Sequence, residues 1–211
     1  MRLKNIPGAK EHVDSSVYLI KNPSSYKGKF KEIFGNNNPI HIEIGMGKGN
    51  FIYNMAKELP NINFIGIEKY DSVMVKGIEK QEENPLSNLR FIKMDATYIN
   101  EVFDHEVDVI YLNFSDPWPK NRHENRRLSS RVFLERYDLL FRKNKEIIMK
   151  TDNRKLFEFS IMSFNNYGYN IDEISLDLYN DNIDFNIPTE YEMKFVSKGN
   201  PIYRIKVSKE V

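Results

Sequence analysis

Residues 40–50 read Ile40-His-Ile-Glu-Ile-Gly-Met-Gly-Lys-Gly-Asn50, an alternating apolar run that meets three closely spaced glycines. Alternation of this kind is typical of a β-strand, and glycine permits the tight turn that ends one. Apolar residues then recur at helical spacing, at Phe51, Ile52, Met55 and Leu59. The segment therefore predicts a strand, a glycine turn and a helix in direct succession.

The rest of the chain repeats this alternation. Apolar runs predict further strands at residues 62–68, 89–94, 107–113, 146–150, 171–178 and 201–207, and helices at 71–83, 97–103, 129–141 and 154–165. Successive strand–helix–strand units form right-handed crossovers that cover a parallel sheet on both faces. We predict an α/β fold with a Rossmann-like, doubly wound, mostly parallel sheet. Residues 179–200 offer only a loop and one helical turn, which favours an antiparallel C-terminal edge strand.

Length and composition predict a single domain. The chain has 211 residues, 40% of them hydrophobic, and no composition break that would mark a linker. We expect one domain over residues 1–211, with a loosely ordered basic arm at 1–30 and the core at 40–207. No apolar run reaches the roughly 18 residues of a membrane span, and the amino terminus lacks the apolar region of a signal peptide. A cytoplasmic protein without a membrane partner is therefore expected.

The residue types present do not favour a metal site. The chain contains no cysteine, so thiolate ligands and disulfides are excluded. Its histidines show no paired ligand spacing; they are His12, His41, His105 and His123. We therefore predict no bound metal.

Acidic residues lie at or near the ends of the first four predicted strands of the core. They are Glu43, Glu68, Asp95 and Asp116. Ligands of doubly wound sheets bind outside the carboxyl ends of the strands, so these acids are candidate ligand contacts. The glycine turn would let backbone approach the same ligand closely, and an acid that ends the second strand can hold ribose hydroxyls.

The segment from Asn113 to Arg127 changes character abruptly after an apolar strand. It reads Asn113-Phe-Ser-Asp-Pro-Trp-Pro-Lys120 and continues into Arg122, His123, Arg126 and Arg127. Prolines on both sides of the only tryptophan stiffen the turn. Residues 117–150 hold ten Lys or Arg against four acids, although the net charge of the chain is only +1. This arrangement favours contact with a nucleobase and with phosphates, and a solvated surface loop is the alternative.

The acids and the glycine spacing indicate which nucleoside cofactor fits. Gly45, Gly47 and Gly49 are spaced as G-x-G-x-G, which departs from the G-x-G-x-x-G pattern of dinucleotide sites. A pocket lined with acids would repel a pyrophosphate and suits a cation. S-adenosylmethionine carries an ammonium and a sulfonium but no phosphate, so it is the cofactor we expect.

Together the motifs resemble the bacterial tRNA (guanine-N7)-methyltransferase family. The resemblance spans residues 40–193 and rests on Glu43-Ile-Gly-Met-Gly-Lys-Gly49, Ile67-Glu68, Met94-Asp95-Ala96, Asn113-Phe-Ser-Asp-Pro-Trp-Pro-Lys120 with Arg122-His123, Lys150-Thr-Asp-Asn153 and Thr189-Glu-Tyr-Glu192. The glycine turn is general among S-adenosylmethionine-dependent methyltransferases. The Ser-Asp-Pro-Trp-Pro-Lys and Thr-x-x-Glu segments are specific in combination.

This resemblance implies methyl transfer from S-adenosylmethionine to N7 of a guanine in the tRNA variable loop. It implies cofactor contact by Glu43, Glu68, Asp95 and Asp116, to which the glycine turn adds Gly45 and Gly47. It implies substrate contact by Lys120, Asp152, Thr189, Glu190, Tyr191 and Glu192, and an RNA-binding segment that contains Arg122, His123, Arg126 and Arg127. The expected partner is tRNA, and the expected protein is a monomer or homodimer without an obligatory protein partner.

The chemistry of guanine N7 suggests what the acids would do. N7 carries an in-plane lone pair and no hydrogen, so its attack on the sulfonium methyl needs no general base. Alignment and fixed negative charge near the purine are then the main sources of catalysis, and Asp116 and Asp152 are the candidates. Guanine's N1–H and amine could donate to Asp152 or Glu192. Structural roles stay open: Asp152 or Thr189–Glu192 could cap helices, and Trp118 could pack in the core.

Three other functions compete with this one. An exocyclic-amine methyltransferase acting on another nucleic-acid base also uses a proline and aromatic turn, but usually with paired prolines before the aromatic residue. A nicotinamide-dependent dehydrogenase is disfavoured by the glycine spacing. A noncatalytic RNA-binding module would not need an acidic cofactor pocket.

Overall fold

The structure is a computed structural model that describes residues 6–181, 183 and 185–210. The strands are β1 Ile40–Ile44, β2 Asn63–Glu68, β3 Leu89–Lys93, β4 Val107–Asn113, β5 Phe141–Thr151, β6 Asn170–Ser175 and β7 Tyr203–Lys209. The α-helices are α1 Ala9–Ser15, α2 Phe30–Phe34, α3 Asn50–Glu58, α4 Asp71–Glu83, α5 Ile99–Val102, α6 Arg131–Tyr137, α7 Arg154–Tyr167 and α8 Glu190–Val196. Short 3-10 helices are η1 Pro23–Tyr26, η2 Ala96–Tyr98 and η3 Asn121–Arg126.

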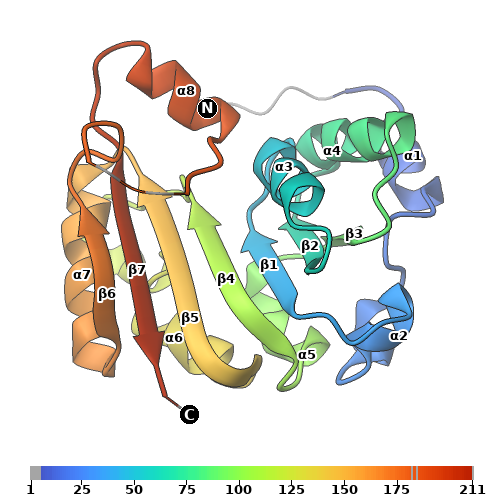
Figure 1. Cartoon of the computed structure of the whole chain (residues 1–211), viewed down its shortest axis with the longest axis horizontal. Coiled ribbons are helices and arrows are strands. Elements are labelled where there is room, and N and C mark those ends of the chain that lie inside the picture. Colours follow the sequence, from blue (N-terminus) through green and yellow to red (C-terminus); the bar gives the residue numbers. More distant parts are fainter. Residues whose placement is uncertain (1–5, 182, 184, 211) are drawn as a thin grey trace.

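All seven strands form one sheet in the order β3-β2-β1-β4-β5-β7-β6 (Figure 1). The five strands from β3 to β5 are parallel, which confirms the predicted doubly wound, mostly parallel sheet. The C-terminal strand β7 pairs antiparallel with β6 at this end of the sheet, as predicted, and also pairs antiparallel with β5. The outermost strand at this end is therefore β6, and β7 lies between the two.

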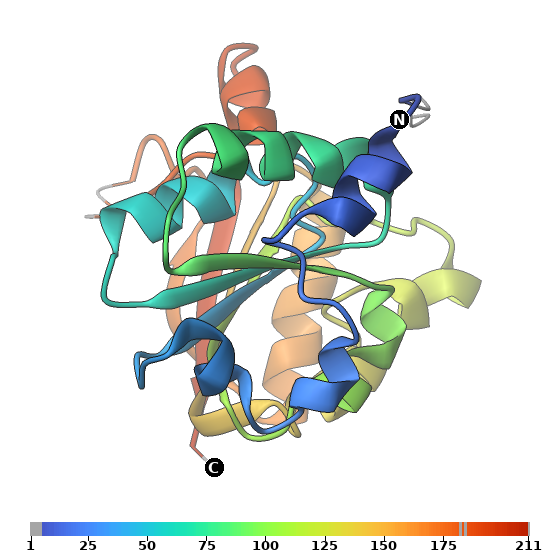
Figure 2. The ribbon, with the colours of Figure 1, turned by 90° about the vertical axis from the view of Figure 1, so that its right-hand side faces the viewer.

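Helices cover both faces of the sheet (Figure 2), and apolar side chains fill the space between them and the strands. On one face α1, α3 and α4 pack against Phe64, Phe91 and Val109. On the other face α5, α6 and α7 pack against Ile42, Ile110 and Ile147. Strands covered on both faces read as nearly continuous apolar runs, which is why the parallel strands were recognisable from sequence.

The expectation of a loosely ordered arm at residues 1–30 is wrong for residues 6–30. Helix α1 packs against α4, and Leu19 forms a parallel bridge with Phe91 in β3. The backbone N–H groups of Gly28 and Phe30 donate to the buried Glu106 carboxylate. Ala9 and Val13 form a short buried face of α1, too short for a clear periodic pattern, and Ile20 and Phe30 are buried elsewhere in the core. Residues 1–5 of the predicted arm lie outside the described residues.

Several element boundaries also differ from the prediction, most of all around β5 and α8. The helix expected over residues 129–141 ends at Tyr137, and Phe141 already belongs to β5. Strand β5 extends through Arg142-Lys-Asn-Lys145, a polar stretch without a strand pattern, to pair with β4 and β7. In residues 179–200 the structure has the seven-residue helix α8, longer than the single turn expected.

Candidate active site

The parallel strands β1, β2, β3 and β4 end at the same side of the sheet, which we call the carboxyl edge; it comprises residues 45–49, 68–70, 94–95 and 114–116. In the glycine turn, Gly45, Gly47 and Gly49 all have positive φ, a conformation that glycine adopts without the steric cost of a Cβ. Gly49 also lies so close to α4 that an added Cβ would be 3.2 Å from the Gly77 Cα. The spacing of these glycines is therefore required by backbone geometry and by helix packing.

Glu68 holds the glycine turn against the end of β2. Its Oε2 accepts the Gly47 N–H at 3.0 Å, and its Oε1 accepts the N–H groups of Lys69 and Tyr70 at 2.7 and 3.0 Å. Burial raises the pKa of this carboxyl, the three backbone donors oppose the rise, and the nearby Asp116 adds to it. Glu68 is thus a partly desolvated carboxylate at the carboxyl edge.

Glu43 is buried one strand away, where Asn113 Nδ2 donates to its Oε1 at 2.9 Å. Burial raises the pKa of Glu43 to about 8, although Asn113 and Lys150 oppose the rise. Among the described residues, Glu43 Oε2 and Asn113 Oδ1 are both buried without a hydrogen-bond partner at ordinary distance, although the Ile52 backbone N–H also lowers the pKa of Glu43. Buried acceptors are seldom left unpaired, so this pair of oxygens is suited to a ligand that brings N–H donors.

Asp95 is more exposed and is already paired. Its carboxylate accepts from Lys69 Nζ at 2.6 Å and from the Thr97 N–H at 2.9 Å. These bonds lower the pKa of Asp95 to about 2. A ligand contact at Asp95 would therefore compete with Lys69 for the same carboxylate.

Asp116 lies in a turn with a strained backbone. Phe114 and Trp118 have φ values of +50° and +40°, which non-glycine residues rarely adopt and which gather at functional sites. The Arg127 guanidinium secures the turn by donating to the carbonyl oxygens of Pro117 and Trp118, each at 3.1 Å. The Asp116 side chain is exposed and has no hydrogen bond or ion pair with the described residues.

Asp152 follows β5 beside this turn, because Asn113 and Lys150 are paired across β4 and β5. The cap of α7 is Asn153, whose side chain accepts the Leu156 N–H at 2.9 Å. The hypothesis that Asp152 caps this helix is therefore wrong. Asp152 is half-buried and has no hydrogen bond or ion pair with the described residues, so its carboxylate can accept a ligand's donors.

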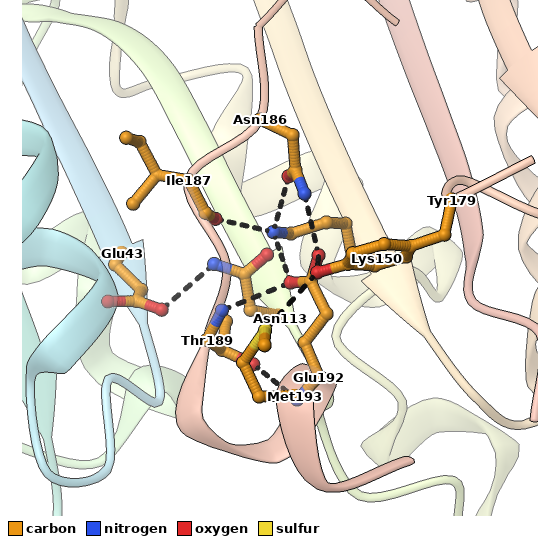
Figure 3. A network of polar contacts seen from close by, with 9 residues as sticks. All are labelled: Glu43, Asn113, Lys150, Tyr179, Asn186, Ile187, Thr189, Glu192 and Met193. Atoms are coloured by element: carbon orange, nitrogen blue, oxygen red, sulfur yellow. Dashed lines mark hydrogen bonds and ion pairs between the residues drawn. The ribbon is translucent and has the colours of Figure 1, made fainter. Parts of the chain in front are cut away.

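The Thr189–Glu192 segment begins α8 with the capping box that its sequence allows. Thr189 Oγ1 accepts the Glu192 N–H, and Glu192 Oε2 accepts the Thr189 N–H (Figure 3). Glu190 reaches the glycine turn, where Lys48 Nζ and Asn50 Nδ2 donate to it at 2.6 and 3.2 Å. The Tyr191 ring stacks on Phe114, with centroids 6.2 Å apart. Helix α8 thus borders the carboxyl edge.

Comparisons with known proteins agree with this geometry. A family model described as "Putative methyltransferase" matches residues 37–205. A tRNA (guanine-N(7)-)-methyltransferase of Lachnoclostridium phytofermentans is 51% identical over 212 residues, covering 100% of this chain and 99% of the relative. A protein of the same name from a Geobacillus species is 52% identical, covering 98% of this chain and 95% of the relative. The chain belongs to the tRNA (guanine-N7)-methyltransferase family.

Solved structures with low sequence identity support the fold of this family member. An antibiotic-related methyltransferase superposes with a TM-score of 0.64 at 22% identity, covering 87% of this chain and 94% of that one. The 16S rRNA methyltransferase KamB gives a TM-score of 0.62 at 12% identity, with the same coverage. Family membership favours the predicted tRNA (guanine-N7)-methyltransferase over the exocyclic-amine, dehydrogenase and noncatalytic alternatives. Within the described residues, no helix combines the length and the apolar character that a bilayer crossing requires.

The basic segment of this methyltransferase divides into exposed and buried arginines. Arg122 and Arg126 are exposed, and the Arg126 guanidinium lies 4.8 Å from the Trp118 ring centroid, with His123 on the same ring. Trp118 is half-buried beneath these side chains rather than packed in the core. Arg127 is only 9% exposed and covers Phe159. The prediction that Arg127 grips phosphate therefore needs correction, because its guanidinium supports the 117–118 turn.

Two residues of the site were not recognised as such from the sequence. Lys150 was counted with the basic block, but it is 2% exposed and paired with Glu192. Its position directly after the apolar Ile147-Ile-Met149 was the available signal, since a lysine that continues a buried strand needs an internal partner. Asn113 begins one of the motifs of the resemblance, but no role follows for it from the sequence, because its bond to Glu43 depends on the pairing of β1 with β4.

Arg126→Ala and Arg127→Ala should have different effects on this enzyme. Loss of the exposed Arg126 should reduce the slope of log K against log [salt] for tRNA binding by about 0.7–0.9, as for one lost phosphate contact. Loss of the buried Arg127 should leave that slope unchanged and lower the free energy of unfolding by about 1–3 kcal/mol, because two turn carbonyls lose their donor. Filter binding over a salt series and thermal unfolding separate the two. A parental slope for Arg126→Ala would mean that the RNA path avoids this segment.

Proposed function

We propose that this protein transfers the methyl group of S-adenosylmethionine to N7 of a guanine in the variable loop of tRNA. The observation that carries the proposal is the full-length similarity to tRNA (guanine-N(7)-)-methyltransferases, together with the gathering of the motif acids at the carboxyl edge. Membership of a methyltransferase family follows from the family model. N7 as the methylated atom and the variable loop as its position are proposed here.

The residues at the carboxyl edge fit S-adenosylmethionine. When bound, this cofactor supplies an electrophilic methyl group on a positively charged sulfur. The unpaired Glu43 Oε2 and Asn113 Oδ1 suit the cofactor's donors, and the Glu68 carboxylate at the end of β2 suits ribose hydroxyls. Gly45 and Gly47 allow the backbone to approach the cofactor. Asp95 would join this set by exchanging its bond to Lys69.

The acceptor base would lie between the turn of Asp116 and Asp152. Asp116 would provide fixed negative charge while positive charge develops on the purine. The unpaired Asp152 carboxylate is suited to the N1–H and amine donors that distinguish guanine from adenine. Lys120 and Arg122 are exposed beyond the turn, where they can contact phosphates.

The proposal is tested by mass spectrometry of nucleosides from unmodified tRNA incubated with the protein and S-adenosylmethionine. We expect N7-methylguanosine, mapped to the variable loop by nuclease fragments. Methylation of an exocyclic amine alone would overturn the choice of N7. A tRNA transcript with adenine at the target position should remain unmethylated and serves as the matched control.

Cofactor binding should depend on pH through Glu43. Because burial raises the pKa of Glu43 to about 8 in the free protein, its carboxyl is mostly protonated at pH 6–7. A cationic cofactor favours the carboxylate, so binding should release a proton and affinity should rise up to about tenfold from pH 6 to 7. Calorimetry in buffers of different ionisation enthalpy measures the released proton. In Glu43→Gln the proton release should vanish, and an unchanged release would exclude Glu43.

A further inference from the structure

Lys150, near the end of β5, is a buried cation whose three hydrogen-bond acceptors come from residues 186–192, which lead into α8 and form its first turn. Its ammonium also lies 5.0 Å from the Phe51 ring centroid. Its ammonium donates to Asn186 Oδ1 at 3.0 Å, to the Ile187 carbonyl oxygen at 2.9 Å and to Glu192 Oε2 at 2.6 Å (Figure 3). A lysine ammonium has only three N–H donors. Residues 186–192 therefore use the full hydrogen-bonding capacity of this side chain.

The Glu192 carboxylate is equally occupied. Besides Lys150, its Oε2 accepts the Thr189 N–H at 3.1 Å. Its Oε1 accepts the Tyr179 hydroxyl at 3.0 Å and Asn186 Nδ2 at 2.8 Å. A carboxylate offers about four acceptor sites, and Glu192 is completely buried. No acceptor site is left for a guanine, so in this arrangement Glu192 supports the site from inside.

A buried ion pair is a poor way to gain stability, because desolvation of both charges offsets their attraction. Its directional bonds can instead fix one arrangement of the segments that it joins. Here the joined segments are the end of β5 and α8, a helix of only seven residues. The other polar contacts of α8 with the glycine turn, made by Glu190, involve half-exposed side chains that solvent screens. The buried pair is therefore the strongest geometric constraint on α8.

Helix α8 in turn places side chains against the site. Tyr191 stacks on Phe114, whose N–H donates to the Lys150 carbonyl oxygen at 2.8 Å. Phe114 leads directly to Asp116 in the same turn. One residue, Lys150, thus contacts the catalytic turn through its backbone and the substrate segment through its side chain.

We propose that Lys150 and Glu192, which we call the α8 anchor, are positioning residues. They hold the predicted substrate-binding segment Thr189–Glu192 in a fixed position next to the carboxyl edge. The proposal rests on the proposed function, and it replaces direct guanine contact by Glu192 with an indirect role. The anchor acts through Tyr191 and the Phe114–Asp116 turn on the placement of the tRNA guanine. The cofactor acids on β1 and β2 are held by other bonds.

The test compares Lys150→Met with Lys145→Met on the same strand. Lys145 is also a mostly buried lysine in an ion pair, with Asp138 at 2.7 Å, but it lies near the middle of β5, five residues before Lys150 and away from the carboxyl edge. We expect Lys150→Met to raise the KM for tRNA at least tenfold. Because loss of the Lys150 charge also raises the pKa of Glu43, the cofactor Kd is compared in Glu192→Gln, which keeps that charge and should change the Kd less than threefold. Lys145→Met should keep the parental KM. A merely structural loss removes active enzyme, which lowers the apparent kcat and leaves KM unchanged.

Glu192→Gln keeps the size of the side chain and remains informative if Lys150→Met does not fold. It should also raise the KM for tRNA, and the double variant should be no worse than the worse single variant, because the two residues act as a unit. Parental KM in Glu192→Gln, or multiplicative effects in the double variant, would overturn the anchor. If the parent protein forms no N7-methylguanosine, the proposed function fails. The same variants then test the anchor through the Kd for tRNA.

Discussion

Asp116→Asn is expected to lower the single-turnover rate of methyl transfer about 100-fold, while the Kd for S-adenosylmethionine changes less than about fivefold. The substitution keeps the shape of an exposed side chain that has no partner among the described residues, so folding should be unaffected. Positive charge moves from sulfur to the purine during the reaction, and a carboxylate beside the purine stabilises the later part of that movement. A 100-fold loss corresponds to about 2.7 kcal/mol of transition-state stabilisation.

Quench-flow with saturating enzyme and cofactor measures that rate, and calorimetry measures the Kd. Asp104→Asn is the matched control. Asp104 is an exposed aspartate in the loop before β4, at the amino-terminal ends of the strands and so opposite the carboxyl edge. The control should react at the parental rate. A parental rate in Asp116→Asn as well would remove this residue from the mechanism.

The sequence predicted the fold well where the burial of apolar side chains alone determines the structure. Strands covered on both faces must be apolar throughout, and α4 and β4 have the predicted bounds of residues 71–83 and 107–113. Prediction failed where tertiary contacts select the structure. The polar start of β5 is a strand because β4 and β7 supply partners, and residues 6–30 are ordered by the packing of α1 on α4 and by the bridge to β3.

The same division applies to the candidate site. Acids at strand ends could be located from the sequence because parallel strands bring their carboxyl ends to one edge. Whether each of these side chains is exposed, buried or paired could not be predicted, because its burial and its partners depend on residues from distant segments. Arg126 and Arg127 are neighbours in sequence, yet one is exposed over Trp118 and the other is buried on Phe159. Likewise, the capping box of α8 was readable, whereas the pairing of Glu192 with Lys150 spans 42 positions.

Glu68→Ala should weaken S-adenosylmethionine binding about 30- to 150-fold, which corresponds to about 2–3 kcal/mol for hydrogen bonds to a charged acceptor. Turnover at saturating cofactor should fall less than about fivefold, because a ribose contact acts equally in the ground and transition states. The substitution also removes the acceptor of the Gly47 N–H, so part of the loss would come from a less ordered glycine turn. Calorimetry measures the Kd for S-adenosylmethionine, and single-turnover experiments on the same preparation measure the rate of methyl transfer.

Glu106→Ala separates a cofactor contact from a general loss of stability. Glu106 is also a buried carboxylate that accepts three backbone N–H groups, from Gly28, Phe30 and Asp104, but it lies just before β4, away from the carboxyl edge. Burial raises the pKa of both carboxyls, so the two substitutions remove similar groups. Both variants should lose thermal stability, and only Glu68→Ala should lose cofactor affinity. Equal weakening of cofactor binding in Glu106→Ala would show that the affinity depends on overall stability, and the assignment of Glu68 to the ribose would then fail.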